Sequence, residues 1–231
     1  MMKLEKGVTT WFEHIKETLS ANESVGIDYS QYPASALKTR TEFFTKADIN
    51  VKSCPVNLVD VVWGGERPPR PTSAATVLGM EFAGESSLDK QARIAEKMKD
   101  AEYDVMLITT LDDIMWMTNL RGTDIDYNPV FFSYALFYPK TDQPSLEVFV
   151  DEAKMAGLQD YLDSQKIKIA SYERIEHKLK SFQEDDLKVG VHLSSCNAYM
   201  HSLLKDSAVE SKNIIQETKC EKNVVEQEGM R

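Results

Sequence analysis

Two hydrophobic periods alternate along the first 63 residues. Trp11, Ile15 and Leu19 recur at the spacing of one helix face, whereas residues 24–29 alternate between apolar and polar side chains, as a half-buried strand does. Helices are therefore expected over residues 11–19 and 33–44, strands over 24–29 and 49–51, and an apolar patch over 58–63. Strand, helix and strand in this order make one unit of an α/β sheet, and a block of this size leaves part of that sheet uncovered.

The pattern is fuller between residues 76 and 218. Apolar runs of strand length alternate there with amphipathic segments of helix length. Strands are expected over residues 104–109, 130–138, 146–150, 167–170, 189–193 and 214–215, and helices over 86–102, 111–118, 155–162, 173–182 and 198–204. A turn over residues 140–144 joins two strands directly, whereas helices separate the others. The pattern thus predicts the α/β class, with a mixed sheet flanked by helices.

A segment rich in glycine and proline separates these two patterns. Gly64 and Gly65 are followed by Pro68, Pro69 and Pro71, and such a run continues neither a helix nor a central strand. We interpret residues 64–75 as a linker between two domains. The block before the linker is then the end of a larger domain, and residues 76–218 form a better developed second one.

Composition narrows the class of protein. The 231 residues carry 27 Lys and Arg against 37 Asp and Glu, a formal net charge of −10, and so acidic a chain lacks the clustered cations of a general nucleic-acid binder. No apolar run reaches the length of a membrane span, and Met1–Lys6 contains no apolar segment of a secretory signal. Three widely spaced cysteines favour a reducing compartment. These features predict a soluble, cytoplasmic protein without nucleic-acid or membrane partners.

Known catalytic motifs are missing from the sequence. The four histidines form no His-Glu-x-x-His pattern, the cysteines have no zinc-ligand spacing, and neither a glycine-rich phosphate loop nor a Gly-x-Ser-x-Gly elbow is present. Acidic clusters at residues 112–113 and 184–186 are more typical of a helix start and a solvated loop than of metal ligands. We therefore predict no catalytic residue and no metal ligand in this chain.

One loop holds an unusual density of polar groups. It spans residues 119–129, between an expected helix and an expected strand, and loops on a rigid α/β scaffold often carry recognition. The candidate contact residues are Arg121, Asp124, Asp126, Tyr127 and Asn128. An ion pair of Arg121 with Asp124 or Asp126 that only stiffens the loop is an alternative of equal weight.

The same loop carries a resemblance to a known family. Residues 119–134, NLRGTD followed by NPVFFSY, resemble the N-L-R-G-S-D…N-P-V-F-x-S-Y signature of the long, three-domain Xaa-Pro aminopeptidases. Further similar stretches follow the family order: Asn57–Trp63 with Arg67–Pro68, Gly84 with Asp89–Lys90, Thr110–Trp116, and Lys222–Asn223 with Glu226 and Glu228–Arg231. The chain is therefore identified as a relative of aminopeptidase P in the creatinase/prolidase superfamily.

The resemblance implies a division into domains. Residues 1–63 would be the C-terminal part of a first creatinase-like domain, 64–75 the linker, 76–218 the second creatinase-like domain, and 219–231 the start of the first helix of a pita-bread catalytic domain. In the family, the metal-binding Asp, Asp, His and two Glu lie in that catalytic domain, so none is assigned to a residue here. An end inside a helix favours a truncated chain over a natural short protein.

The resemblance also implies a role. The chain would be the non-catalytic N-terminal region of an enzyme that removes an N-terminal residue preceding proline, using two divalent metal ions, usually described as manganese, in the missing domain. It would hold no cofactor, be inactive alone, and assist the access or positioning of proline-containing peptides, or assembly, with a homodimer left open. Arg121 would then offer a fixed cation to a carboxylate, oriented by Asp124 and Asp126. The alternative is a stand-alone, catalytically inactive creatinase-like module that binds another protein.

Overall fold

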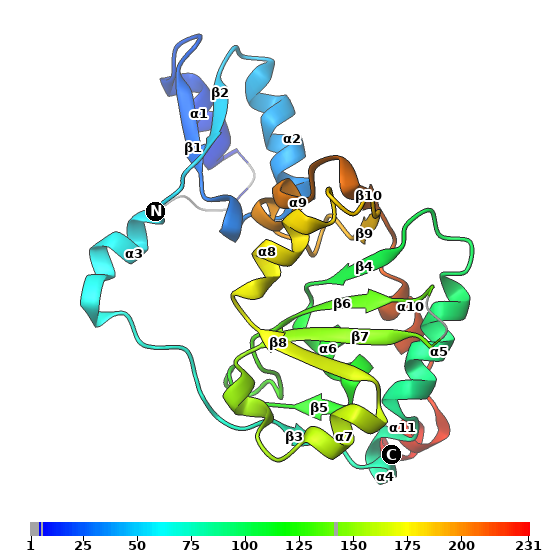
Figure 1. Ribbon diagram of the computed structural model, residues 1–231. Helices are drawn as coiled ribbons and strands as arrows, with labels where there is room; N and C mark the ends of the chain where they lie inside the picture. Colours follow the sequence, from blue (N-terminus) through cyan, green and yellow to red (C-terminus); the bar gives the residue numbers. More distant parts are fainter. Residues whose placement is uncertain (1–4, 6, 141–142) are drawn as a thin grey trace. The chain divides into compact units, whose positions relative to one another are not determined.

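The computed structural model describes residues 5, 7–140 and 143–231. Parts of two sequence-based expectations, the absent signal segment in Met1–Lys6 and the turn over residues 140–144, therefore lie outside the described residues. The chain divides into two compact units, Met1–Pro68 with Asn197–Tyr199, and Pro69–Cys196 with Met200–Arg231. Each unit has its own strands (Figure 1).

The first unit is built on a two-stranded parallel sheet. Its elements are α1 (Trp11–Thr18), β1 (Ser24–Ile27), η1 (Tyr29–Gln31), α2 (Ala34–Thr45), β2 (Asn50–Ser53), α3 (Leu58–Trp63) and η2 (Gly64–Glu66). Thr10 and Glu13 form a capping box, which satisfies the free N–H groups at the start of α1. The stretch expected only as an apolar patch is helix α3, because the side chain of Asn57 caps its first turn.

Six strands form the centre of the second unit. The strands of this unit are β3 (Thr76–Val77), β4 (Val105–Ile108), β5 (Leu120–Arg121), β6 (Tyr134–Tyr138), β7 (Ser145–Val150), β8 (Ile167–Ser171), β9 (Val189–Val191) and β10 (Ala208–Glu210). The main sheet has the order β10-β9-β4-β6-β7-β8, and β6 runs antiparallel to both of its neighbours while the other pairs are parallel. The predicted mixed sheet is thus confirmed. β3 and β5 pair separately as a small antiparallel sheet.

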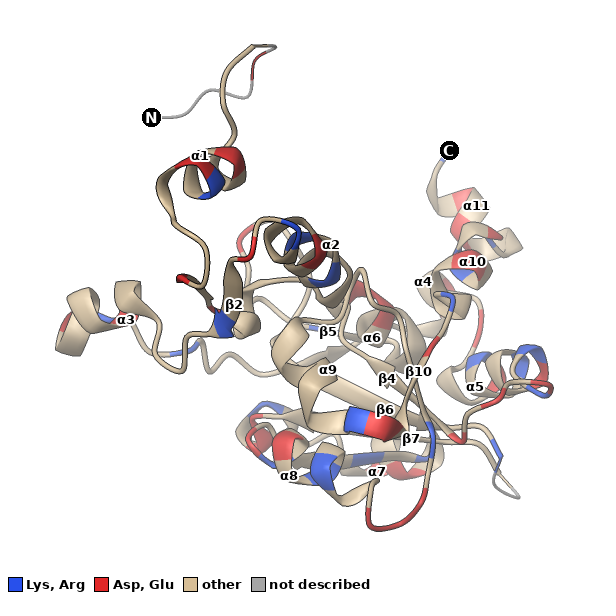
Figure 2. Ribbon diagram, turned by 90° about the horizontal axis from the view of Figure 1, so that it is seen from above, with Lys and Arg blue, Asp and Glu red and all other residues tan. Residues whose placement is uncertain are grey.

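Helices cover both faces of the main sheet (Figure 1). The helices after residue 69 are α4 (Met80–Ala83), α5 (Ser87–Lys97), α6 (Leu111–Thr118), η3 (Glu152–Met155), α7 (Gln159–Ser164), α8 (Arg174–Ser181), α9 (Ala198–Leu204), η4 (Lys205–Ser207), α10 (Ile214–Cys220) and α11 (Val224–Gly229). In β4, Val105 and Leu107 pack with α8 and α9, whereas Met106 and Ile108 pack with α5 and α6. This alternation is the two-residue period of a strand that is buried on both faces. Charged residues gather on outer elements such as α5 and α8 (Figure 2).

Three predicted elements differ from the observed ones. Ile214 and Ile215 begin helix α10 rather than forming the last strand, because the side chain of Asn213 accepts the Gln216 N–H and caps a helix there. The strand expected from residue 130 begins only at Tyr134. The helix expected over residues 155–162 is divided into η3 and α7, and Gly157 between them has a positive φ of 79°, which a helix does not allow.

Candidate functional site

The polar loop between β5 and β6 closes as a tight turn. The backbone N–H of Asn128 donates to the carbonyl of Ile125 at 3.1 Å, and the Gly122 N–H donates to the carbonyl of Pro129 at 3.3 Å. A side chain at Gly122 would lie 2.8 Å from Cβ of Phe131, so the close approach of the two arms of the loop requires glycine. The loop is therefore an ordered structure with a defined tip.

Asp124 anchors the base of this loop. Its Oδ1 lies 2.6 Å from Nζ of Lys154, and its Oδ2 accepts the backbone N–H of Phe132 at 2.8 Å. The side chains of Asp124 and Lys154 are 0% and 3% exposed. Lys154 also donates to the carbonyls of Pro71 and Ser73 at 2.7 and 3.4 Å. One buried ammonium therefore joins the loop to the segment before β3 in the same unit.

Arg121 makes its contacts elsewhere. Its Nη1 donates to the carbonyls of Met115 and Leu120, at 2.9 and 2.7 Å, so that the guanidinium lies at the C-terminal end of helix α6, where a cation is favourable. Burial lowers the pKa of this guanidinium. The side chain lines a groove with α4 and α11, whereas Asp124 lines a different pocket.

The ion pair of Arg121 with Asp124, one form of the stiffening alternative for this loop, is therefore not formed. Asp124 forms its ion pair with Lys154 and not with Arg121, and so it does not orient the guanidinium of Arg121. The physical reason is that residues three apart on a tight loop point in different directions, and a buried carboxylate is satisfied by the cation that is buried beside it.

The remaining three candidates form the exposed tip. Asp126, Tyr127 and Asn128 are all exposed, and the Tyr127 side chain reaches fully into solvent. Tyr127 has a φ of 63°, a left-handed conformation that is unfavourable for an aromatic residue. The structure thus separates the five candidates into an anchored base, Arg121 and Asp124, and a free tip.

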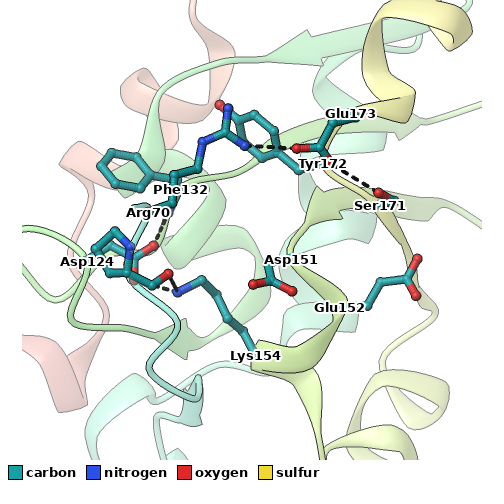
Figure 3. A pocket seen from close by; sticks show the side chains of 10 residues that line it. Arg70, Asp124, Phe132, Asp151, Glu152, Lys154, Ser171, Tyr172 and Glu173 are labelled. Carbon is teal, nitrogen blue, oxygen red and sulfur yellow. Dashed lines mark hydrogen bonds and ion pairs between the residues drawn. The ribbon is translucent and has the colours of Figure 1, made fainter. Parts of the chain in front are cut away.

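A pocket of about 390 Å³ lies beside Asp124, at the carboxyl ends of β7 and β8 (Figure 3). In sheets with parallel strands, ligands bind at this edge, where loops leave the strands. β7 and β8 are parallel and pair Val150 with Ser171, so the residues that follow each strand meet there. The lining residues are Arg70, Pro71, Asp124, Phe132, Asp151, Glu152, Lys154, Ser171, Tyr172 and Glu173.

Charged and aromatic groups converge in this pocket (Figure 3). Nη1 of Arg70 lies 3.0 Å from Oε1 of Glu173, and the Arg70 guanidinium carbon lies 4.2 Å from the centre of the Tyr172 ring. A hydrogen bond from its own backbone N–H is the main cause that lowers the pKa of the Glu173 carboxyl, and Ser171 and Arg70 lower it further. Asp151 accepts the backbone N–H of Ala153, 3.1 Å from its Oδ1, and begins η3.

Sequence reasoning found only Asp124 among the residues of this pocket. Arg70 belongs to the segment interpreted as a linker, while Lys154, Tyr172 and Glu173 follow predicted strands. A usable signal was present, because a helix was expected between the strands over residues 146–150 and 167–170. That order makes the two strands parallel and brings their carboxyl ends to the same edge.

The described residues do not fit a metal centre. Across residues 5, 7–140 and 143–231, no three His, Cys, Asp or Glu side chains are grouped so that they could hold a metal ion. A serine hydroxyl does approach a histidine, with 3.1 Å between Oγ of Ser195 and Nδ1 of His192, but the same hydroxyl also donates to the His192 carbonyl in a local turn. None of the described helices has the length and apolar character of a membrane span.

Comparisons with known proteins identify the family. The profile of the family described as Creatinase/Prolidase N-terminal domain matches residues 66–226. The probable Xaa-Pro aminopeptidase P of Laccaria bicolor is 32% identical over 97% of this chain and 35% of its own length, and that of Coccidioides posadasii (strain C735) is 33% identical over 98% and 36%. The chain thus spans little more than a third of the length of these relatives.

A solved structure extends this similarity to the fold. The crystal structure of X-prolyl aminopeptidase from Caenorhabditis elegans, described as a cytosolic enzyme with a di-nuclear active site, matches 99% of this chain with a TM-score of 0.88 and 25% identity, and the match covers 38% of that protein. The family profile, the fungal relatives and this fold agree with the resemblance found in the loop signature. The chain belongs to the creatinase/prolidase N-terminal domain family.

Proposed function

We propose that this chain is the non-catalytic N-terminal region of a Xaa-Pro aminopeptidase, an enzyme that removes an N-terminal residue preceding proline. One observation carries the proposal: similarity to such peptidases extends over 97% of the chain, while the described residues gather no metal-binding group. A scaffold whose described residues gather no metal-binding group fits a region that works together with a separate catalytic domain.

The partner in this proposal is the pita-bread catalytic domain of the same enzyme. That domain would hold two divalent metal ions, with manganese as our expectation, and would take proline-containing peptides as substrates. The Caenorhabditis elegans relative is described as cytosolic and di-nuclear, which supports a cytoplasmic location and a two-metal site in the complete enzyme. The N-terminal region would limit access to the catalytic cleft, position the peptide, or assist assembly.

The exposed loop tip is our candidate contact with that partner. Asp126, Tyr127 and Asn128 offer hydrogen-bonding groups and an aromatic ring to solvent, and Asp124 and Arg121 fix the base on which they stand. An unfavourable backbone conformation such as that of Tyr127 is retained where the surrounding structure holds it in place, and such positions cluster at functional sites. The tip therefore has both the exposure and the rigidity of a recognition element.

A chimera tests the proposed function. This chain would replace the matched segment of the Laccaria bicolor relative, and hydrolysis of Xaa-Pro peptides would be measured for the chimera, the isolated chain and the remaining catalytic region alone. We expect chelator-sensitive hydrolysis by the chimera, none by the isolated chain, and at least about tenfold less by the catalytic region alone. Chelator-insensitive turnover by the isolated chain would contradict the proposal. The stand-alone binding module would be favoured if the isolated chain captured a non-peptidase protein stoichiometrically while the chimera showed no more hydrolysis than the catalytic region alone.

The loop tip is tested in the same chimera by Tyr127→Gly. Glycine accepts a positive φ without cost, so we expect the variant to be as stable as the parent or slightly more stable, while hydrolysis falls by about tenfold through the lost contact. Asn22→Gly is the matched control, because Asn22 is also exposed with a positive φ of 70° but lies in the first unit. Equal activity of both variants and the parent would remove the tip from the proposed contact.

A further inference from the structure

The pocket at the carboxyl ends of β7 and β8 already contains a guanidinium, supplied by the chain itself. The Arg70 side chain enters from the segment before β3, stacks over the Tyr172 ring at 4.2 Å and pairs with Glu173 at 3.0 Å (Figure 3). An aromatic face combined with a carboxylate is the usual means by which proteins recognise organic cations. The corner formed by Tyr172 and Glu173 therefore has the chemistry of a guanidinium site.

Arg70 is held there only weakly. The side chains of Arg70 and Glu173 are 62% and 72% exposed, and an ion pair between two such exposed groups contributes little because water competes for both of them. Within the described part of the chain, the further contact of the Arg70 guanidinium is the face of the Tyr172 ring. A cation that finds further partners in the pocket can therefore displace it.

The rest of the pocket offers those further partners. Carboxylates outnumber cations in the lining of the pocket, so negative charge is in excess. The two cations are Arg70 and Lys154, and the four carboxylates are Asp124, Asp151, Glu152 and Glu173. Lys154 already forms an ion pair with Asp124 and donates hydrogen bonds to the carbonyls of Pro71 and Ser73. Among the residues that the structure describes, neither Asp151 nor Glu152 forms an ion pair with Lys, Arg or His. An added cation would lower this unbalanced negative potential.

We propose that this pocket binds the guanidinium of an arginine side chain carried by a peptide, and that Arg70 is an intramolecular occupant that competes with it. The incoming group takes the place of Arg70 on Tyr172 and Glu173, and Asp151 and Glu152 attract its positive charge. A volume of about 390 Å³ accommodates a long side chain with its neighbouring backbone. This site does not depend on the peptidase assignment, because every group that forms it belongs to this chain.

Calorimetric titration of the 231-residue chain with N-acetyl-arginine methylamide tests this site. The probe has no charged termini, so its side chain supplies the only charge. We expect Arg70→Ala to bind it about tenfold more tightly than the unaltered chain, because the competing guanidinium is removed. Glu173→Gln, added to Arg70→Ala, should weaken binding by about tenfold. Arg70→Gln is a second variant that vacates the site while keeping a polar side chain.

Two controls make the result specific. Arg67→Ala removes the same charge from an exposed arginine that pairs with Asp60 at 2.8 Å and does not line the pocket, and it should leave the affinity unchanged. The citrulline analogue of the probe has nearly the same shape without the charge and should bind at least about tenfold more weakly to Arg70→Ala. Equal affinity of the unaltered chain and both Arg70 variants would overturn the proposal, as would equal binding of the citrulline probe. N-acetyl-lysine methylamide carries the same charge without the planar guanidinium, and equal binding of this probe to Arg70→Ala would overturn the guanidinium assignment.

Discussion

At the scale of single residues, buried cations explain how the loops of the second unit are held. Lys154 is one case, and Lys90 on α5 is another. Lys90 is 2% exposed, its Nζ donates to the Trp116 carbonyl at 3.0 Å and to Oδ1 of Asn119 at 2.6 Å, and it lies 4.7 Å from the centre of the Trp116 ring. It therefore closes the C-terminal end of α6, where Asn119 adopts the left-handed conformation that ends a helix.

The buried position of Lys90 predicts a pH dependence of stability. Burial lowers the pKa of its ammonium from 10.5 to about 8, so the native protein releases this proton at a lower pH than the unfolded chain. Where the unfolded state binds more protons, the free energy of unfolding rises with pH. Between about pH 7.5 and about pH 9, we expect the stability of the unaltered chain to gain about 1 kcal/mol relative to that of Lys90→Met.

Denaturant unfolding at several pH values measures this difference. Subtracting the Lys90→Met curve removes the contributions of other groups, including the Cys196 thiol, whose pKa burial raises to about 12. A group with a raised pKa of this kind acts in the opposite direction, because stability is lost when the unfolded thiol ionises. If the difference between the two curves does not change with pH, the proposed proton release from Lys90 is wrong.

At the scale of elements, side-chain caps decide where the short helices begin. Asn223 begins α11 with a capping box: its Oδ1 accepts the Glu226 N–H at 2.9 Å, and Oε2 of Glu226 accepts the Asn223 N–H at 2.9 Å. Nδ2 of Asn223 also donates to the Ala83 carbonyl at 2.8 Å, which ties α11 to α4. One amide side chain thus both starts a helix and docks it.

Replacing this cap should loosen α11. Asn223→Ala removes the cap and the tie to Ala83, and we expect the free energy of local opening to fall by about 1–2 kcal/mol. Hydrogen exchange of the α11 amides should then be about tenfold faster. Asn57→Ala, which removes the equivalent cap of α3 in the first unit, is the control and should leave α11 unchanged. Unchanged exchange in Asn223→Ala would show that packing alone fixes this helix.

The element predictions succeeded where an apolar run filled a complete strand or helix, and failed where a local contact set the boundary. β4 was found because its four consecutive apolar residues form a buried run of strand length, and α6 because an apolar segment of helix length follows two acidic residues in its first turn. The start of β6 was misplaced because Val130 and Phe131 are as apolar as a strand, yet the Asp124 carboxylate takes the neighbouring Phe132 N–H. The two-residue strands β3 and β5 are too short to have a period of their own.

At the scale of the whole molecule, the two units differ in how much core they bury. The second unit encloses a layer of buried side chains on each face of its sheet, among them Ile94 and Phe137 on one face and Leu179 on the other. In the first unit the described residues bury few large apolar side chains, and Phe44 is the bulkiest of those that are fully enclosed. A smaller core buries less apolar surface on folding, so we expect the first unit to have a lower free energy of unfolding by itself than the second.

The α/β class, the order of most strands and helices, and the family could be inferred from the sequence, because the hydrophobic pattern and the loop signature are local properties of the chain. Which charges form pairs became known only from the folded structure. Asp124 is paired with a lysine 30 residues away, and Arg70 with a glutamate 103 residues away. Electrostatic partners are chosen by distance and burial in the folded chain, and neither follows from spacing along the sequence. For that reason the proposed guanidinium pocket could be recognised only in the folded chain, at the carboxyl ends of β7 and β8.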